Sequence, residues 1–96
     1  MSSISIGDFS NLKGDIHLVD IRSVEKYNSS HIPGAINIPA QKLLLNPNNF
    51  LDKNVKYYLY CQHGMSSRNV VNILCKLGFD VVNISGGYES WIINKV

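Results

Sequence analysis

The segment Tyr60-Cys61-Gln62-His63-Gly64-Met65-Ser66-Ser67-Arg68 joins two regular elements that the flanking residues predict. Before it, Val55 to Tyr60 is rich in β-branched and aromatic residues, which is typical of a strand. After it, apolar residues at helical spacing predict a helix over Arg68 to Leu77, with a buried stripe formed by Val70, Ile73, Leu74 and Leu77. Cys61 is therefore expected at the end of a strand, in a short loop that leads into a helix.

The position predicted for Cys61 favours an ionised thiol. The start of a helix presents unpaired N–H groups and the positive end of the helix dipole, and this loop has no acidic side chain. A free cysteine has a pKa of about 8.5, which such surroundings lower to roughly 3.5–7.5. The thiolate is the nucleophilic form, so we predict that Cys61 is a catalytic nucleophile. Gly64 is expected to let the loop curl around the sulfur, because glycine tolerates positive φ.

The other polar side chains of this segment have two interpretations each. Ser66 and Ser67 either donate hydrogen bonds to the sulfur or its ligand, or cap the helix. His63 either contributes to anion binding or is an exposed loop histidine. Arg68 opposes the helix dipole, so it is either an anion-recognition residue or a solvated surface arginine. The predicted substrate-binding set is the whole segment after the cysteine: Gln62, His63, Gly64, Met65, Ser66, Ser67 and Arg68.

Composition and charge predict one soluble globular domain over residues 1–96, since 45% of the residues are hydrophobic and 17% are charged. The net charge of +2 mildly favours a small anionic substrate. The basic residues are scattered, so nucleic-acid binding is not expected. No apolar run approaches the length of a membrane span, and Met1 to Ser10 does not resemble a secretory signal. We therefore expect a cytoplasmic protein with no membrane association.

The second cysteine, Cys75, is expected to be a small packed hydrophobe at the edge of the helix stripe. It lies fourteen residues from Cys61, which is not a zinc-ligand or redox-motif spacing. Two cysteines without an export signal predict free thiols in a reducing compartment. Neither a metal site nor a cofactor is predicted.

The rest of the chain alternates between strand and helix patterns, which predicts a parallel sheet covered on both faces. The strands are expected at Ser3 to Ile6, Ile16 to Asp20, Ala35 to Ile38, Val55 to Tyr60 and Phe79 to Ile84. Short helical segments are expected at Val24 to Asn28 after an N-cap at Ser23, Gln41 to Leu45, Asn49 to Leu51 and Tyr88 to Asn94, and Gly7 to Lys13 is expected to be a short connector or a single helical turn. Gly78 is expected at the C′ position of the helix that follows Cys61. Ligands of such sheets bind beyond the carboxyl ends of the strands, where Asp20, Cys61 and the turn Ser85 to Gly87 are expected.

Four motifs together resemble the rhodanese family in its single-domain form. They fall in family order and spacing: Val19-Asp20-Ile21-Arg22, His31 to Pro39 (HIPGAINIP), Tyr60 to Ser67 (YCQHGMSS), and Ile84-Ser85-Gly86-Gly87 followed by Trp91. The resemblance implies a three-layer α/β/α fold whose five-stranded parallel sheet has the order 1-5-4-2-3. Many members carry Arg or Lys inside the active loop, whereas this chain has only His63 there.

The resemblance also implies sulfurtransferase chemistry without a cofactor. Cys61 would take the outer sulfur of a small anionic donor such as thiosulfate, become a persulfide, and pass the sulfur to cyanide or a thiol. Asp20, Arg22, Gly86 and Gly87 are predicted to support the site, the first two by ordering neighbouring loops through an ion pair or backbone hydrogen bonds.

The sequence leaves three alternatives open. Phosphatases and arsenate reductases can share this fold, but their loop needs five residues between the cysteine and an arginine. That arginine would stand at position 67, which is Ser here, with Arg68 one residue late. A rhodanese-like binding module without activity is the second alternative. The third is a sulfur relay to a protein acceptor, for which an exposed Met65 would suit docking.

Overall fold

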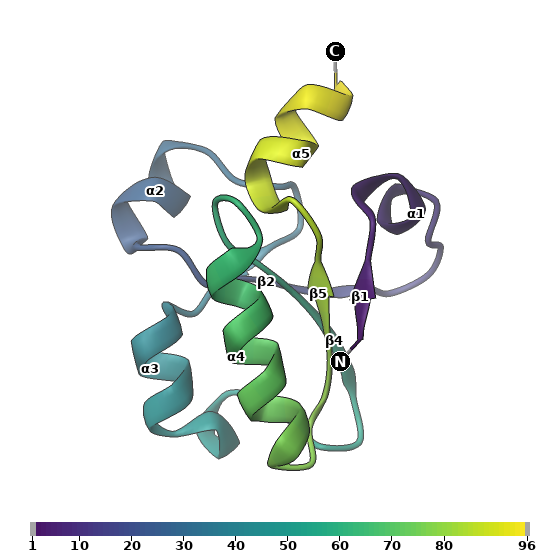
Figure 1. Cartoon of the computed structure of the whole chain (residues 1–96). Coiled ribbons are helices and arrows are strands. Elements are labelled where there is room, and N and C mark those ends of the chain that lie inside the picture. The colour runs from purple at the N-terminus through teal and green to yellow at the C-terminus, as the bar shows by residue number, and fades with distance from the viewer. Residues whose placement is uncertain (1, 96) are drawn as a thin grey trace.

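A five-stranded parallel sheet forms the centre of the molecule in a computed structural model, which describes residues 2–95 (Figure 1). The strands are β1 (Ser3–Ile4), β2 (His17–Asp20), β3 (Ile36–Asn37), β4 (Lys56–Tyr60) and β5 (Asp80–Ile84). Their order is β1-β5-β4-β2-β3, and every pair is parallel, for example Asp20 beside Tyr60 and Leu59 beside Asn83. The predicted sheet and strand order are confirmed.

Helices cover both faces of the sheet, as Figure 1 shows. They are α1 (Ile6–Ser10), α2 (Val24–Ser29), α3 (Ala40–Leu45), α4 (Met65–Lys76) and α5 (Gly87–Lys95), with a 3-10 turn at Pro47–Asn49. The helix α3 contacts α4, and α1 contacts α5. Alternate residues of β4 point to opposite faces: Leu59 packs in the cluster under α3 and α4, whereas Tyr60 packs in the cluster under α1 and α5.

The buried face of α4 differs from the stripe that the sequence predicts. Ile73 and Leu77 are 45% and 51% exposed, whereas Val71 is fully buried and faces the core with Val70 and Leu74. The helix begins at Met65, three residues earlier than predicted, and buries Ser67 against Cys61. This contact fixes the rotation of the helix, because residues three, four and seven positions after Ser67 share its face. The apolar spacing alone did not reveal that rotation.

Several other boundaries also differ from those predicted, including those of the first and third strands. The first strand ends at Ile4, because Ser5 caps α1: its side chain accepts a hydrogen bond from the N–H of Asp8. The third strand is limited to Ile36–Asn37, since it lies at the sheet edge and pairs with β2 alone.

Both helix caps predicted from the sequence are present. The Ser23 side chain accepts from the N–H of Lys26 at 3.3 Å at the start of α2. After α4, Gly78 has φ 96° and donates to the carbonyl of Cys75, while Phe79 donates to Leu74, which is the Schellman arrangement. Across residues 2–95, no helix combines the length and apolar character needed to cross a bilayer.

Candidate active site

The sulfur of Cys61 lies directly after β4, inside the loop that leads into α4. The cysteine is 6% exposed, and its Sγ accepts three hydrogen bonds. The N–H of Gly64 donates at 3.1 Å, and Ser67 donates through both its N–H and its hydroxyl, each at 3.3 Å. All three donors come from the loop and the first turn of α4, as expected for an anion-binding helix start.

These donors determine the ionisation of the thiol. Burial of Cys61 raises its pKa, because a thiolate is poorly solvated inside the protein. Hydrogen bonds from the Ser67 hydroxyl and from the N–H groups of Ser67, Gly64 and His63 favour the thiolate and outweigh burial. The net effect lowers the pKa of Cys61 below its ordinary value, so more of the nucleophilic form is present at neutral pH.

Glycines permit the close approach of the Cys61 loop and the turn before α5. Gly64 caps α4 with φ 94°, and a β-carbon there would lie 2.6 Å from the nitrogen of Gly86. A β-carbon at Gly87 would lie too close to the carbonyl oxygen of Cys61. The two segments therefore pack backbone against backbone, and a side chain at these glycine positions would push them apart.

Asn83 lies behind the loop on β5, and sequence reasoning missed it. It is 2% exposed. Its side-chain oxygen accepts a hydrogen bond from the Ser67 hydroxyl, and its side-chain NH₂ group donates to the backbone carbonyl of Gly64 at 3.3 Å. The Ser67 hydroxyl has a single proton, for which three acceptors compete: the sulfur of Cys61, the carbonyl of Gly64 and the side-chain oxygen of Asn83. A polar residue inside an otherwise apolar strand, Val81-Val82-Asn83-Ile84, was the available signal.

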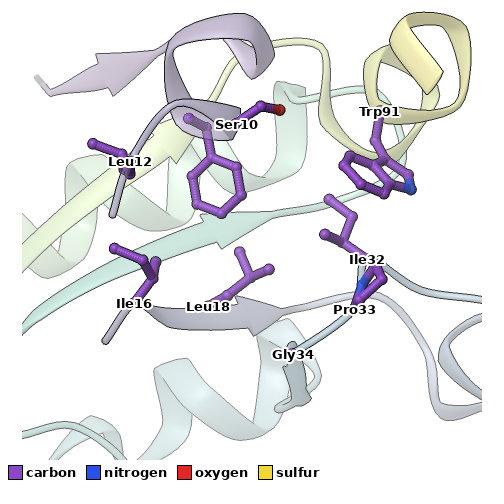
Figure 2. Close-up of a pocket in the computed structure, with 9 residues that line it drawn as sticks. Ser10, Leu12, Ile16, Leu18, Ile32, Pro33, Gly34 and Trp91 are labelled. Atoms are coloured by element: carbon purple, nitrogen blue, oxygen red, sulfur yellow. The ribbon is translucent and has the colours of Figure 1, made fainter. Parts of the chain in front are cut away.

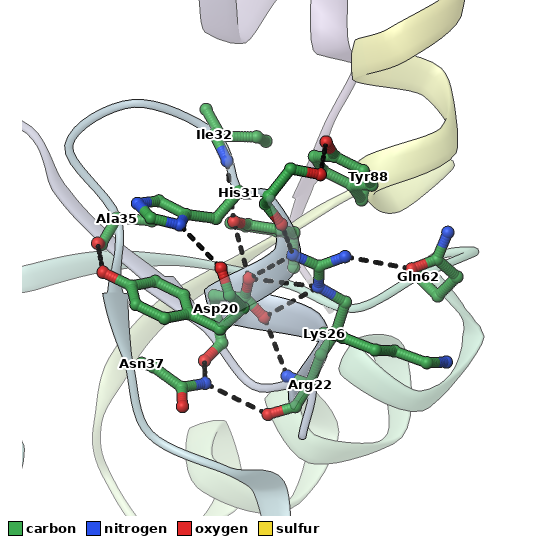
Figure 3. A network of polar contacts seen from close by, with 12 residues as sticks. Asp20, Arg22, Lys26, His31, Ile32, Ala35, Asn37, Gln62 and Tyr88 are labelled. Carbon is green, nitrogen blue, oxygen red and sulfur yellow. Dashed lines mark hydrogen bonds and ion pairs between the residues drawn. The ribbon is translucent and has the colours of Figure 1, made fainter. Parts of the chain in front are cut away.

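A buried ion pair supports the loop from the neighbouring strand (Figure 3). The carboxylate of Asp20 is fully buried and accepts from the guanidinium of Arg22 at 2.7 Å and from the hydroxyl of Tyr60 at 2.8 Å. Arg22 also donates to the side-chain oxygen of Gln62 at 3.0 Å, and its guanidinium lies 4.2 Å from the centre of the Tyr88 ring. The ion pair is one of the two contacts predicted for Asp20 and Arg22, and their role in ordering the loops stays a prediction.

The remaining predicted residues lie at the surface around the loop. Met65 is 73% exposed, and Ser66 and Arg68 are also exposed. The side chain of His63 pairs with Glu89 of α5, with 2.7 Å between Nδ1 and Oε2. Of the two serines, only Ser67 reaches the sulfur, and neither caps α4, whose N-cap is Gly64.

Two pockets of about 370 Å³ flank the loop, and the side chain of His63 lines both. One contains Arg68 and Met65, and the other contains Arg22, Lys26 and Glu89. A third, apolar pocket of similar volume lies away from the loop, between α1, β2 and α5 (Figure 2). Within residues 2–95, no group of three or more His, Cys, Asp or Glu side chains is arranged to hold a metal ion.

Known proteins of one family resemble this chain over almost its whole length. The model of the rhodanese-like domain family matches residues 6–94. The chain belongs to the rhodanese-like domain family. It is 35% identical over 80 residues to a protein of Shewanella oneidensis named thiosulfate sulfurtransferase GlpE, covering 79% of this chain and 75% of that protein.

Solved structures of rhodanese-like proteins share the fold. A rhodanese-like domain protein from Staphylococcus aureus superposes with a TM-score of 0.82 at 34% identity, covering 95% of this chain and 91% of that one. A rhodanese-related protein from Thermoplasma volcanium gives a TM-score of 0.86 at 32% identity, covering 98% and 93%. The sequence prediction of an enzyme of the rhodanese type is therefore confirmed at the level of the family.

Proposed function

We propose that this rhodanese-like domain is a sulfurtransferase that carries sulfane sulfur as a persulfide on Cys61. The Cys61 thiolate attacks the outer sulfur of a donor such as thiosulfate, the donor's S–S bond breaks, and sulfite leaves with the bonding electron pair. The persulfide anion is then attacked at its outer sulfur by cyanide or a thiolate, and Cys61 returns as the thiolate. Both steps conserve charge and need no cofactor.

The observation that carries the proposal is the set of donors around the sulfur. The N–H of Gly64 and the N–H and hydroxyl of Ser67 point at Cys61 Sγ, and they lower the pKa of this thiol despite its burial. The same donors are available to a persulfide anion, so one arrangement stabilises the charge in both halves of the cycle. The relatives named thiosulfate sulfurtransferase support the reaction class.

Two observations weigh against the alternative functions. In a phosphate-binding loop an arginine would stand at position 67, where this chain places a buried serine that donates to the sulfur, while Arg68 is exposed. A binding module needs no activated cysteine, yet three hydrogen-bond donors contact the thiol here.

Transfer to a protein acceptor is compatible with the site, since Met65 is exposed beside the loop. The two free cysteines fit a reducing compartment such as the cytoplasm.

The test is mass spectrometry after incubation with thiosulfate and removal of excess donor. We expect an adduct of about 32 Da, one sulfur atom, on the peptide that contains Cys61. Thiocyanate should form when cyanide is added to the wild type and to Cys75→Ser, because Cys75 lies on the far part of α4, where its thiol contacts the carbonyl of Val81.

Cys61→Ser is expected to form neither adduct nor thiocyanate. Sulfur transfer that survives in Cys61→Ser would contradict the proposal. Hydrolysis of an aryl phosphate faster than sulfur transfer would instead favour phosphoryl chemistry.

A further inference from the structure

The ionisable side chain inside the Cys61 loop is paired with a carboxylate from another element. Among residues 62–67, His63 alone can carry a charge. Its Nδ1 lies 2.7 Å from Oε2 of Glu89, and the two side chains are 64% and 51% exposed. A protonated His63 therefore adds no net charge to the loop entrance, and a neutral one leaves Glu89 as a net negative charge.

Backbone contacts fix Glu89 beside the loop. At the start of α5, the N–H of Tyr88 donates to the carbonyl of Cys61 at 2.8 Å, and the N–H of Glu89 donates to the carbonyl of Gln62 at 3.0 Å. The carboxylate is thus attached to the same short segment that holds the loop, one residue from the ring that packs on Arg22. Its charge is a fixed feature of the entrance.

Three other charged side chains lie at the entrance beside this carboxylate. Arg22 is neutralised by Asp20, with which it forms a buried ion pair. Lys26 lines the same pocket as Glu89, and Arg68 lines the pocket on the other side of His63. Within residues 2–95, neither Lys26 nor Arg68 forms an ion pair, so each adds one positive charge, and the charge of Glu89 offsets one of these beside the loop.

We propose that Glu89 is a specificity-determining residue that disfavours dianionic sulfur donors and favours donors with a single negative charge, such as organic thiosulfonates. The inference rests on the proposed sulfur transfer and concerns its first step. In that step the Cys61 thiolate takes the outer sulfur of either donor, and the donor's S–S bond breaks. Sulfite leaves from thiosulfate and a sulfinate leaves from a thiosulfonate, so the same persulfide forms in both cases.

The expected effect scales with the charge on the donor. Near a protein surface and at low ionic strength, one elementary charge at the entrance changes the rate of encounter with the donor by about threefold for each unit of charge on the donor. Removing the Glu89 charge should therefore raise kcat/KM by about tenfold for thiosulfate and by about threefold for methanethiosulfonate. The ratio of the two values, thiosulfonate over thiosulfate, should fall by about threefold. The ratios of the wild type and the variant should converge as salt screens the charge.

The experiment measures that ratio with cyanide as acceptor, because kcat/KM for the donor reports only its own half of a two-step cycle. Glu89→Gln removes the charge and retains an oxygen that accepts from His63. Glu89→Lys reverses the charge and should lower the ratio about threefold further. The matched controls are Asp80→Asn and Asp80→Lys, which change the net charge equally at the opposite end of β5, where Asp80 is exposed. We expect the controls to keep the wild-type ratio.

An unchanged ratio in both Glu89 variants would overturn the inference, as would an equal shift in the Asp80 controls. These results differ from a failure of the proposed function. If the wild type formed no Cys61 persulfide from either donor, as judged by mass spectrometry, the sulfur-transfer proposal and this inference would fail together. A persulfide that forms from both donors at a ratio independent of residue 89 would contradict the inference alone.

Discussion

At the scale of single residues, Ser66 and Ser67 occupy different environments, which the sequence could not distinguish. Ser67 is fully buried and donates to the Cys61 sulfur through its N–H and its hydroxyl, whereas Ser66 is exposed. The N–H belongs to the backbone and remains in any substitution. The hydroxyl is the one donor to this sulfur that a point mutation can remove without altering the loop.

We expect Ser67→Ala to shift the acid limb of the pH–rate profile to higher pH. The hydroxyl favours the thiolate, so its loss raises the pKa of Cys61, and less nucleophile is present at a given pH below that pKa. Because a hydrogen bond to a charged group is worth about 1.5–3 kcal/mol, kcat/KM at pH 7 should fall by about tenfold. The measurement is donor kcat/KM between pH 5 and about 10, with Ser66→Ala for comparison. An acid limb that moves equally in both variants would contradict a specific role for Ser67.

At the scale of elements, the start of α4 depends on the backbone of the turn before α5. Gly64 has φ 94° and approaches the Gly86 nitrogen so closely that a β-carbon would lie 2.6 Å away. Gly14 offers a matched comparison, because it has φ 91° but a β-carbon added there would meet no atom within 4 Å. The two glycines share the same conformational requirement and differ in packing.

We expect Gly64→Ala to slow persulfide formation strongly and Gly14→Ala to preserve it. Both variants should lose about 1–2 kcal/mol of stability from the left-handed backbone conformation. Only Gly64→Ala must also push the loop away from Gly86, which misplaces the donors around the sulfur and should lower kcat/KM by about 100-fold. Urea unfolding and donor kinetics on both variants separate the two effects. Equal activity in the two alanine variants would show that the close contact is unnecessary.

At the scale of the whole molecule, one carboxylate connects segments that lie far apart in the sequence. Asp20 is fully buried at the end of β2 and accepts from Arg22 and from the Tyr60 hydroxyl of β4. Arg22 continues the network to the carbonyl of Ser30 at 2.6 Å and to the side chain of Gln62. The pair therefore contacts both the segment after α2, through Ser30, and the Cys61 loop, through Gln62 (Figure 3).

We expect Asp20→Asn to destabilise the protein by about 3–5 kcal/mol, because it leaves the buried guanidinium of Arg22 without a counter-charge. The measurement is the free energy of unfolding in urea. Asp80→Asn is the control, since it removes an exposed carboxylate and should change stability by less than about 0.5 kcal/mol. If Asp20→Asn lowered the free energy of unfolding by less than about 1 kcal/mol, solvent would have to reach Arg22, and the ion pair would not be what orders the loops.

The sequence by itself determined the strand–loop–helix position of Cys61, the parallel sheet and its order through the family motifs, and the caps at Ser23 and Gly78. These features depend on local patterns: alternation of strands and helices, a glycine after a helix, and a hydroxyl before one. Tertiary structure alone decided which face of α4 is buried, which serine reaches the sulfur, and that Asn83 and Glu89 belong beside the loop. Those outcomes depend on contacts between segments sixteen or more residues apart, or on the rotation that packing imposes on a helix, and no local pattern encodes either.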